Sequence, residues 1–207
     1  MARAKTAKAP RKAVRQARQA RSRATVATIV EAATRILARD GWDSLNTNAI
    51  AARAGVSVGS VYEYFPNKQA ILDVVLESHL ARGEVLINER ASQVASDPDP
   101  LAVVRLLVDG YISVHRDDPR LHRVLSGEVP LSKAQRQRID SLRSQVVSLV
   151  TIALEGQVPR PGIKANLIVD TADALAHRWL VDEVGVPASP DVMQTELERM
   201  LSLYVVS

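Results

Sequence analysis

Apolar residues recur at helical spacing along almost the whole chain after residue 23. In the first segment they lie three or four positions apart, and Asp40-Gly41 ends the pattern: Val26, Ile29, Val30, Ala33 and Leu37. No segment shows the sustained apolar-polar alternation of a strand. The pattern therefore predicts an all-α protein of about nine helices without a sheet.

Residues 45–68 predict two short helices joined by a tight turn. Asn46 or Thr47 caps a helix that Gly55 ends, and Ser57 caps a second helix that Pro66 ends. Four apolar positions would pack this pair against the first helix: Ile50, Ala51, Val61 and Phe65. Such a pair is either a DNA-reading helix-turn-helix or a plain packing unit of an all-α protein.

Longer amphipathic segments fill the rest of the chain. Their apolar stripes lie near residues 67–93, 101–115, 139–153, 168–179 and 191–204, with a short segment at 119–125. Breaks rich in Pro, Asp and Gly separate them. These breaks predict a tail, a domain that contains the pair of short helices and a larger C-terminal domain, at residues 1–22, 23–68 and 69–207.

Charge is distributed unevenly along the chain. Residues 1–23 carry nine Lys or Arg and no acidic residue, whereas residues 24–207 carry 18 basic and 23 acidic residues. Such an arm predicts a disordered tail attracted to polyanions, most commonly nucleic acid. A solvated tail without contacts and an organelle transit peptide are the alternatives; scarce Ser and no clear amphipathic face argue against the latter.

The composition excludes several classes of protein. At 46% hydrophobic residues the chain can bury a core, and without Cys it can form no disulfide, thiolate zinc site or Cys nucleophile. No apolar run approaches the roughly 18 residues of a spanning helix. The four His lie in no HExxH motif, and no GxSxG or GxxxxGK[ST] motif occurs. We expect a cytoplasmic protein that is not an enzyme and needs no cofactor or metal.

Aromatic and small residues in the second short helix favour DNA reading. Four of the seven aromatics lie within residues 42–65. Tyr62 and Tyr64 are two positions apart, so they cannot both be buried on one face, and a tyrosyl hydroxyl is a good phosphate donor. The small pair Gly59-Ser60 permits close approach to base edges. The stretch TNAIAARAGVSVGSVYEYFPNKQAIL resembles the DNA-binding domain of TetR-family transcriptional regulators.

The resemblance implies a role for each matching position. Backbone contacts would come from Thr47 and Asn48, base contacts from the start of the recognition helix, and phosphate or thymine-methyl contacts from its tyrosines; the full set is Thr47, Asn48, Ser57, Val58, Gly59, Ser60, Tyr62, Tyr64 and Lys68. Lys68 lies at a helix N-terminus, which favours anions independently. The recognition helix lacks the side chains that usually form bidentate hydrogen bonds with bases, because residues 58–65 contain no Arg, Lys, Asn or Gln. Specificity then depends on van der Waals contacts, Asn48, water or DNA shape.

In family terms the remaining helices would hold a small-molecule pocket and form a homodimer. Polar or aromatic groups on or beside the apolar stripes are candidate ligand contacts: Arg105, Tyr111, His115, His122 and Trp179. The commoner interpretation of such residues is that they are buried groups with satisfied hydrogen bonds. Asp170, Asp173 and His177 share a helix face that could hold a divalent ion, but a polar face is the more frequent explanation.

The stripes of residues 163–184 and 191–205 could close a four-helix bundle with a second copy. Candidate interface residues are Ile168, Ala172, Leu175, Leu197, Met200, Leu201 and Tyr204. The alternative is that the monomer's own core uses both stripes.

Together with these patterns, the resemblance implies a DNA-binding transcriptional regulator, expected to be a repressor that binds a palindromic operator as a homodimer and is released by a small-molecule effector. Two alternatives stay open. One is a sequence-tolerant DNA-binding protein driven by the basic tail, and the other is a small-molecule binding protein or enzyme with a vestigial headpiece.

Overall fold

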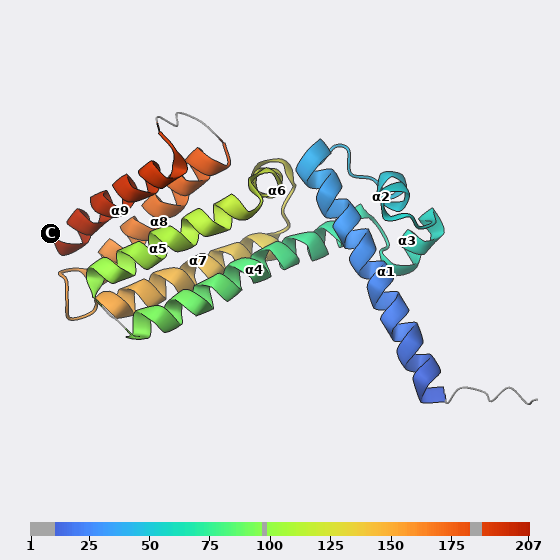
Figure 1. Ribbon diagram of the computed structural model, residues 1–207, viewed down its shortest axis with the longest axis horizontal. Coiled ribbons are helices and arrows are strands. Elements are labelled where there is room, and N and C mark those ends of the chain that lie inside the picture. Colours follow the sequence, from blue (N-terminus) through green and yellow to red (C-terminus); the bar gives the residue numbers. More distant parts are fainter. Residues whose placement is uncertain (1–10, 97–98, 183–187) are drawn as a thin grey trace, which may run out of the picture. The chain divides into compact units, whose positions relative to one another are not determined.

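A computed structural model describes residues 11–96, 99–182 and 188–207, and over these residues helices joined by loops make up the fold, without strands (Figure 1). The all-α prediction is confirmed. The elements are α1 (Arg11–Asp40), α2 (Thr47–Ala54), α3 (Val58–Tyr64), α4 (Lys68–Ser96), α5 (Pro100–Asp117), α6 (Pro119–Arg123), a π-helical turn η1 (Val124–Glu128), α7 (Lys133–Leu154), α8 (Pro161–Leu180) and α9 (Pro190–Val206). None of the described helices is long and apolar enough to cross a membrane.

The chain divides into two units after Val75. The first contains α1 to α3 and the first two turns of α4, so it extends past the boundary that we expected after residue 68. Ile71, Leu72 and Val75 explain the difference, because these side chains of α4 are buried and belong to the first unit. The second unit contains the rest of α4 and all later helices.

Local side-chain caps define the short helices of the first unit. The Asn46 side chain accepts a hydrogen bond from the N–H of Ala49 at 2.9 Å, and Asn67 accepts one from the N–H of Ala70 at the same distance. Gly55 ends α2 in the left-handed region at φ 68°, which costs glycine little. The core beneath these helices contains fully buried side chains from each of them, including Ile29, Leu37, Leu45, Ile50 and Val61.

The basic N-terminal segment is partly helical. Because α1 begins at Arg11, the expectation of a disordered tail up to residue 22 is wrong for residues 11–22. This segment is rich in Ala, Arg, Gln and Lys, which have high helix propensity, and a helix that is already nucleated extends at little cost. Residues 1–10 of the expected tail, with three of its basic residues, lie outside the described part of the chain.

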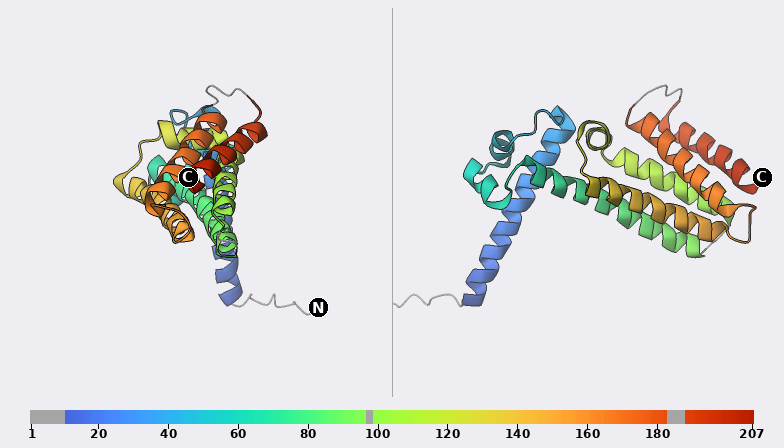
Figure 2. Two further views of the ribbon diagram at one scale, coloured as in Figure 1. Left: turned by 90° about the vertical axis from the view of Figure 1, so that its left-hand side faces the viewer. Right: turned by 180° about the vertical axis from the view of Figure 1, so that it is seen from behind.

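The second unit is built around α5 and α8. Figures 1 and 2 show α5, α8 and α9 side by side, with α7 packed along α8. Their buried side chains form one apolar cluster that includes Val104, Val108, Leu154, Ile168 and Val169. The predicted breaks agree with this arrangement, since α5 begins at Pro100 behind the cap Asp99 and α9 begins at Pro190.

Lys164 joins the first turn of α8 to the last turn of α9. Its side chain is buried, and Nζ donates hydrogen bonds to the carbonyl oxygens of Val205 at 2.9 Å and Tyr204 at 3.2 Å. A cation is favourable at a helix C-terminus, where carbonyl groups lack helical partners. The buried charge therefore fixes the relative position of α8 and α9.

Most of the residues expected at a dimer interface lie in the monomer's own core. Four of them are buried, so they are not available to a second copy, and the expectation is wrong for Ile168, Ala172, Leu197 and Leu201. Leu175 and Tyr204 are half-buried against the same core, whereas Met200 is 47% exposed. The strong stripes of α8 and α9 face inward because α5 covers them. A second, exposed apolar set lies on the same two helices: Ile163, Leu167, Val192, Leu203 and Val206.

Candidate nucleic-acid interface and regulatory cavity

The first unit presents every residue that we expected at the DNA. None of the nine is buried, and the set spans α2, the turn, α3 and the start of α4. Tyr62 is 54% exposed and Val58 is 37% exposed, whereas Val61 and Phe65 of the same segment are buried. The helix α3 therefore packs through one side and leaves the other side accessible.

Two residues of the expected interface contact each other across the turn. The hydroxyl of Thr47 on α2 lies 3.2 Å from the hydroxyl of Tyr62 on α3, within hydrogen-bond distance. The contact places the Tyr62 hydroxyl at the first residue of α2, which the exposed Asn48 follows in the sequence. Both hydroxyls can also donate to phosphate oxygens, so the pair forms a preorganised polar edge.

The N-terminus of α3 is compact and accessible. Ser57 accepts a hydrogen bond from the N–H of Ser60 at 3.0 Å, and their hydroxyls lie 2.8 Å apart. A Cβ at Gly59 would meet only the Ser57 hydroxyl, at 3.7 Å, so space around this glycine is open. This end of α3 thus offers small polar groups and little steric bulk to a groove.

Lys68 begins α4 beside an aromatic ring. Its Nζ lies 4.1 Å from the ring centroid of Trp42, a cation–π arrangement that restrains the side chain. The helix N-terminus adds partial positive charge at the same place. No basic residue lies on α3 itself, so the positive charge nearest to α3 along the chain is at Lys68 on α4 and at the exposed Arg53 on α2.

The second unit contains a cavity of about 700 Å³ between α4, α5, α6, α7 and α8. Most of its wall is apolar, with side chains such as Leu86, Ile87, Leu106, Val146 and Val150. Polar and charged side chains also line it, among them Arg90, Tyr111, His115, Asp140 and Arg143. This volume and lining are typical of small-molecule sites.

Three of the five expected ligand residues line this cavity. They are Tyr111, His115 and His122. Burial raises the pKa of Tyr111, so its hydroxyl is a neutral donor at physiological pH. Arg105 instead is exposed and lies 4.0 Å from Asp99, and Trp179 packs half-buried against the apolar core; neither belongs to the cavity wall.

All four histidines of the chain form one cluster, and three of them, His79, His115 and His122, line the cavity. They come from four helices: His79 on α4, His115 on α5, His122 on α6 and His177 on α8. The ring centroids of His115 and His122 are 4.4 Å apart, and that of His177 lies 5.6 and 5.3 Å from them. The His79 ring packs edge-on against His122 at 5.2 Å. Sequence spacing gave no sign of this cluster, because no two of its residues lie within one helix.

Burial favours the uncharged form of three of these imidazoles, His79, His115 and His122. Burial, together with the nearby His115, His79 and His177 rings, lowers the pKa of His122 to about 3. Burial also lowers the pKa values of His79 and His115 below their ordinary value. At neutral pH these rings are therefore available as neutral donors, acceptors or metal ligands.

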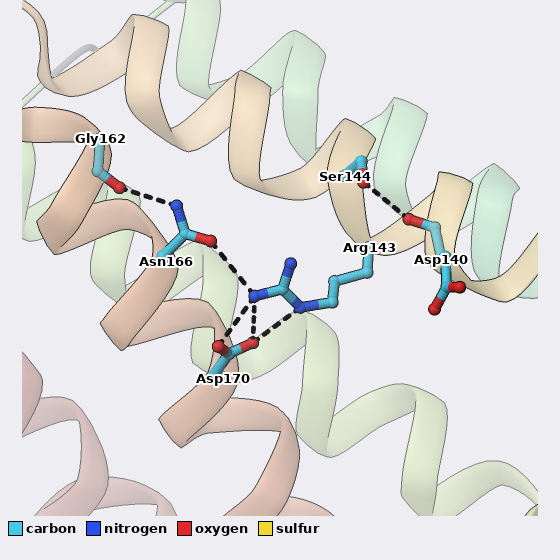
Figure 3. A network of polar contacts seen from close by, with 6 residues as sticks. All are labelled: Asp140, Arg143, Ser144, Gly162, Asn166 and Asp170. Atoms are coloured by element: carbon cyan, nitrogen blue, oxygen red, sulfur yellow. Dashed lines mark hydrogen bonds and ion pairs between the residues drawn. The ribbon is translucent and has the colours of Figure 1, made fainter.

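The acidic face of α8 is divided between two sets of contacts. Figure 3 shows Arg143 of α7 on Asp170, with Nε and Nη2 each 2.8 Å from a carboxylate oxygen, and Nη2 also 3.2 Å from Asn166. Asp173 instead lies 3.6 Å from Nε2 of His115. The helix-face set Asp170, Asp173 and His177 is therefore split, because Arg143 engages the first carboxylate.

Comparison with known families matches both parts of the chain. Residues 29–75 match the family model of bacterial regulatory proteins of the tetR family, and residues 99–204 match that of the tetracyclin repressor-like C-terminal domain. The HTH-type transcriptional regulator TtgR of Pseudomonas putida is 30% identical over 191 residues, covering 82% of this chain and 84% of that protein.

Solved structures share the fold over nearly the full length. NalD, the secondary repressor of the MexAB-OprM multidrug efflux pump of Pseudomonas aeruginosa, has a TM-score of 0.71 at 19% identity, with 89% of this chain and 97% of that chain covered. The transcriptional regulator FadR from Bacillus subtilis in complex with stearoyl-CoA has a TM-score of 0.62 at 20% identity, with 87% and 97% covered.

Proposed function

This chain belongs to the TetR family of bacterial regulatory proteins, and we propose that it represses transcription as a homodimer on a palindromic operator until an effector enters its cavity. DNA-binding transcriptional regulation is the function of the family, which is not a family of enzymes. The observation that carries the proposal is the accessible side of α3, with Tyr62 and the small residues of its N-terminus facing outward.

In this proposal α3 lies in the major groove. Gly59 and Ser60 allow close approach to base edges, and Val58 offers an apolar contact to thymine methyl groups. Tyr62, held by Thr47 at 3.2 Å, and Lys68, held by the Trp42 ring, bind the flanking phosphates. Because α3 has no bidentate base reader, DNA shape and the amide of Asn48 supply part of the specificity.

The homodimer forms through the outward side of α8 and α9. Ile163 and Leu167 on α8 and Leu203 and Val206 on α9 are each about half or more exposed in the monomer. Two copies of this helix pair would form a four-helix bundle that removes the apolar side chains from water. A two-fold dimer carries two copies of α3, which accounts for a palindromic operator.

The effector is an apolar molecule with a polar group. The cavity wall is mainly aliphatic, and Tyr111 and the histidines supply hydrogen-bonding groups at defined positions. The binding of stearoyl-CoA by the structural relative FadR supports a cavity of this kind as an effector site. Helix α4 begins in the DNA-binding unit and continues along the cavity, so it transmits the change. An effector releases DNA only by preferring the conformation that binds the operator poorly.

Selection of bound fragments from the source genome tests this proposal. We expect the protein to retain a small set of fragments and to prefer them over unrelated DNA by about a thousandfold at fixed salt. A Tyr62→Ala variant should lose the preference, while a Tyr111→Phe variant, altered only in the cavity, should keep it. Equal binding to all fragments would instead support a sequence-tolerant protein driven by its basic N-terminal segment.

A further inference from the structure

We propose that His115, His122 and His177 form a binding site for a divalent transition-metal ion such as Zn²⁺, where His115 and His122 line the cavity. The site itself rests on the geometry of the second unit. Its regulatory role rests on the proposed function, because the ion would act through the same cavity.

The three rings are arranged as ligands of one ion. One nitrogen from each lies within 4.8 Å of the other two, and the rings are buried or half-buried. Donors on a tetrahedral ion with Zn–N bonds of about 2.05 Å are about 3.3 Å apart. Small side-chain rotations would bring the nitrogens to that spacing.

The hydrogen bond of the His115 ring leaves its other nitrogen, Nε2, free of that bond and able to coordinate an ion. Its Nδ1 donates to the backbone oxygen of Tyr111 at 2.8 Å, so Nε2 carries the lone pair. Metal-bound histidines commonly donate their second nitrogen to a backbone carbonyl in this way. Nε2 faces Oδ1 of Asp173 at 3.6 Å, longer than a hydrogen bond but close to the spacing of two ligands on one ion. A cation held by the three histidines would lie near this carboxylate, whose negative charge favours it, and a water molecule would take the fourth position.

His79 positions His122 from the neighbouring helix. Its Nε2 lies 3.2 Å from Nδ1 of His122, and the guanidinium of Arg82 lies 3.4 Å from the other nitrogen of His79. The contact occupies Nδ1 of His122 and leaves Nε2 for the ion. Through His79 the site also connects to α4, so the ion would join α4, α5, α6 and α8.

The donor set selects the class of metal. Three imidazole nitrogens suit Zn²⁺, Co²⁺, Ni²⁺ or Cu²⁺, whereas Mg²⁺ and Ca²⁺ prefer oxygen ligands. The chain offers no thiolate, since it contains no Cys. An ion held by helices on several sides of the cavity stabilises one arrangement of those helices, so metal occupancy and operator affinity should change each other by the same factor.

Metal titration of the tag-free protein tests the site directly. Because all four histidines of the chain belong to the cluster, histidine coordination can come from nowhere else. After treatment with a chelator, we expect Co²⁺ to give the visible absorption of a tetrahedral complex at one ion per chain, and Zn²⁺ to displace it. The His122→Gln and His177→Gln variants should bind Co²⁺ at least about a hundredfold more weakly than the wild type. The positioning variant His79→Gln should bind it about tenfold to a hundredfold more weakly.

Two comparisons control for folding and for charge. His115 is almost fully buried, so the half-buried His177 provides the variant that keeps the core intact, with circular dichroism as the check. Asp170→Asn removes a carboxylate that Arg143 already engages, and it should leave Co²⁺ affinity unchanged within about twofold. Absence of saturable Co²⁺ or Zn²⁺ binding, or unchanged affinity in folded His122→Gln and His177→Gln, would overturn the site.

DNA binding gives a separate readout. We expect Zn²⁺ to change the affinity of the wild-type protein for its selected fragment by about fivefold or more, and not to change that of His177→Gln. Metal binding without any effect on the fragment would overturn the regulatory role alone. Fragment binding without metal binding would refute the metal site and leave the repressor function standing. Metal binding without selective DNA binding would support the metal site and refute the repressor function.

Discussion

The two units of the chain use their polar side chains in opposite directions. In the first unit Tyr62, Asn48 and Ser57 face outward from short helices, above a core of aliphatic residues and Phe65. In the second unit the polar groups of interest face inward, because the histidines meet at a cavity wall and His115 is buried. Side chains that face outward can contact a macromolecule at many separate points. Side chains that face inward can only bind a small molecule or ion, and they do so together.

This difference predicts how substitutions combine. In our proposal the DNA contacts are spread over α2, α3 and α4, so the effects on DNA affinity of removing distant contacts should add. The histidines lie within 6 Å of a neighbour in the cluster, so the loss of one changes the others. Substitutions in the first unit should therefore reduce binding in separate, additive steps. Substitutions in the histidine cluster should have effects that depend on one another.

Core substitutions should have the largest effect, and they test whether the two units unfold independently. Ile50→Ala in the first unit and Leu154→Ala in the second each remove a fully buried side chain and should lower the free energy of unfolding by about 2–5 kcal/mol. The two tryptophans of the chain, Trp42 and Trp179, lie one in each unit. Replacing either with Phe makes the fluorescence of the other report on a single unit. Ile50→Ala should shift the Trp42 transition far more than the Trp179 transition; equal shifts would mean that the units unfold as one.

The exposed side of α8 and α9 should give the next largest effect. Leu203 is 66% exposed, so Leu203→Glu should leave the monomer folded and weaken the homodimer by about 2 kcal/mol or more through burial of an unpaired charge. Val85→Glu on α4, where the side chain is 55% exposed, is the matched control and should leave the dimer unchanged. Sedimentation equilibrium measures both. A Leu203→Glu protein that sediments as the wild type does would exclude this surface as the interface.

A single hydroxyl on the outward surface should have a moderate effect. Tyr62→Phe removes the group that contacts Thr47 and, in our proposal, a phosphate, so operator affinity should fall up to about tenfold, or 1.4 kcal/mol. Tyr111→Phe makes the same chemical change at the cavity wall. Fluorescence anisotropy without effector should show no loss for Tyr111→Phe. A similar loss in both variants would contradict the division of roles between the units.

The smallest expected effects concern the salt dependence of binding. Lys68→Gln removes one cation per chain from the DNA-binding surface and should reduce the log–log slope of affinity against salt by about 0.9 for each phosphate that is no longer neutralised. Deletion of residues 1–10, which carry Arg3, Lys5 and Lys8, should also give a shallower slope if the tail reaches DNA. The slopes come from anisotropy titrations at several salt concentrations. An unchanged slope after the deletion would remove the tail from the interface.

Local signals made the first unit predictable. The caps at Asn46 and Ser57 and the turn at Gly55 each depend on residues a few positions apart, and each occurs where the sequence predicts it. The exposed side of α3 follows from the same short-range pattern.

The second unit depends on tertiary contacts that a sequence pattern does not contain. The histidine cluster needs four helices to meet, and the stripe of Ile168 and Ala172 fits a dimer interface as well as a monomer core until α5 is placed. The start of α1 was missed for another reason, because composition alone did not separate a basic disordered tail from a basic helix.

The central claim is that the outward side of α3 lies in the major groove. The most direct test is methylation of guanine N7, because this atom is accessible only from that groove. On a fragment selected from the genome, we expect bound protein to protect guanines in two segments about one helical turn, or a multiple of it, apart. Tyr62→Ala should lose this protection. Full reactivity of the guanines in a fragment that the protein still binds selectively would contradict the placement of α3 in the major groove.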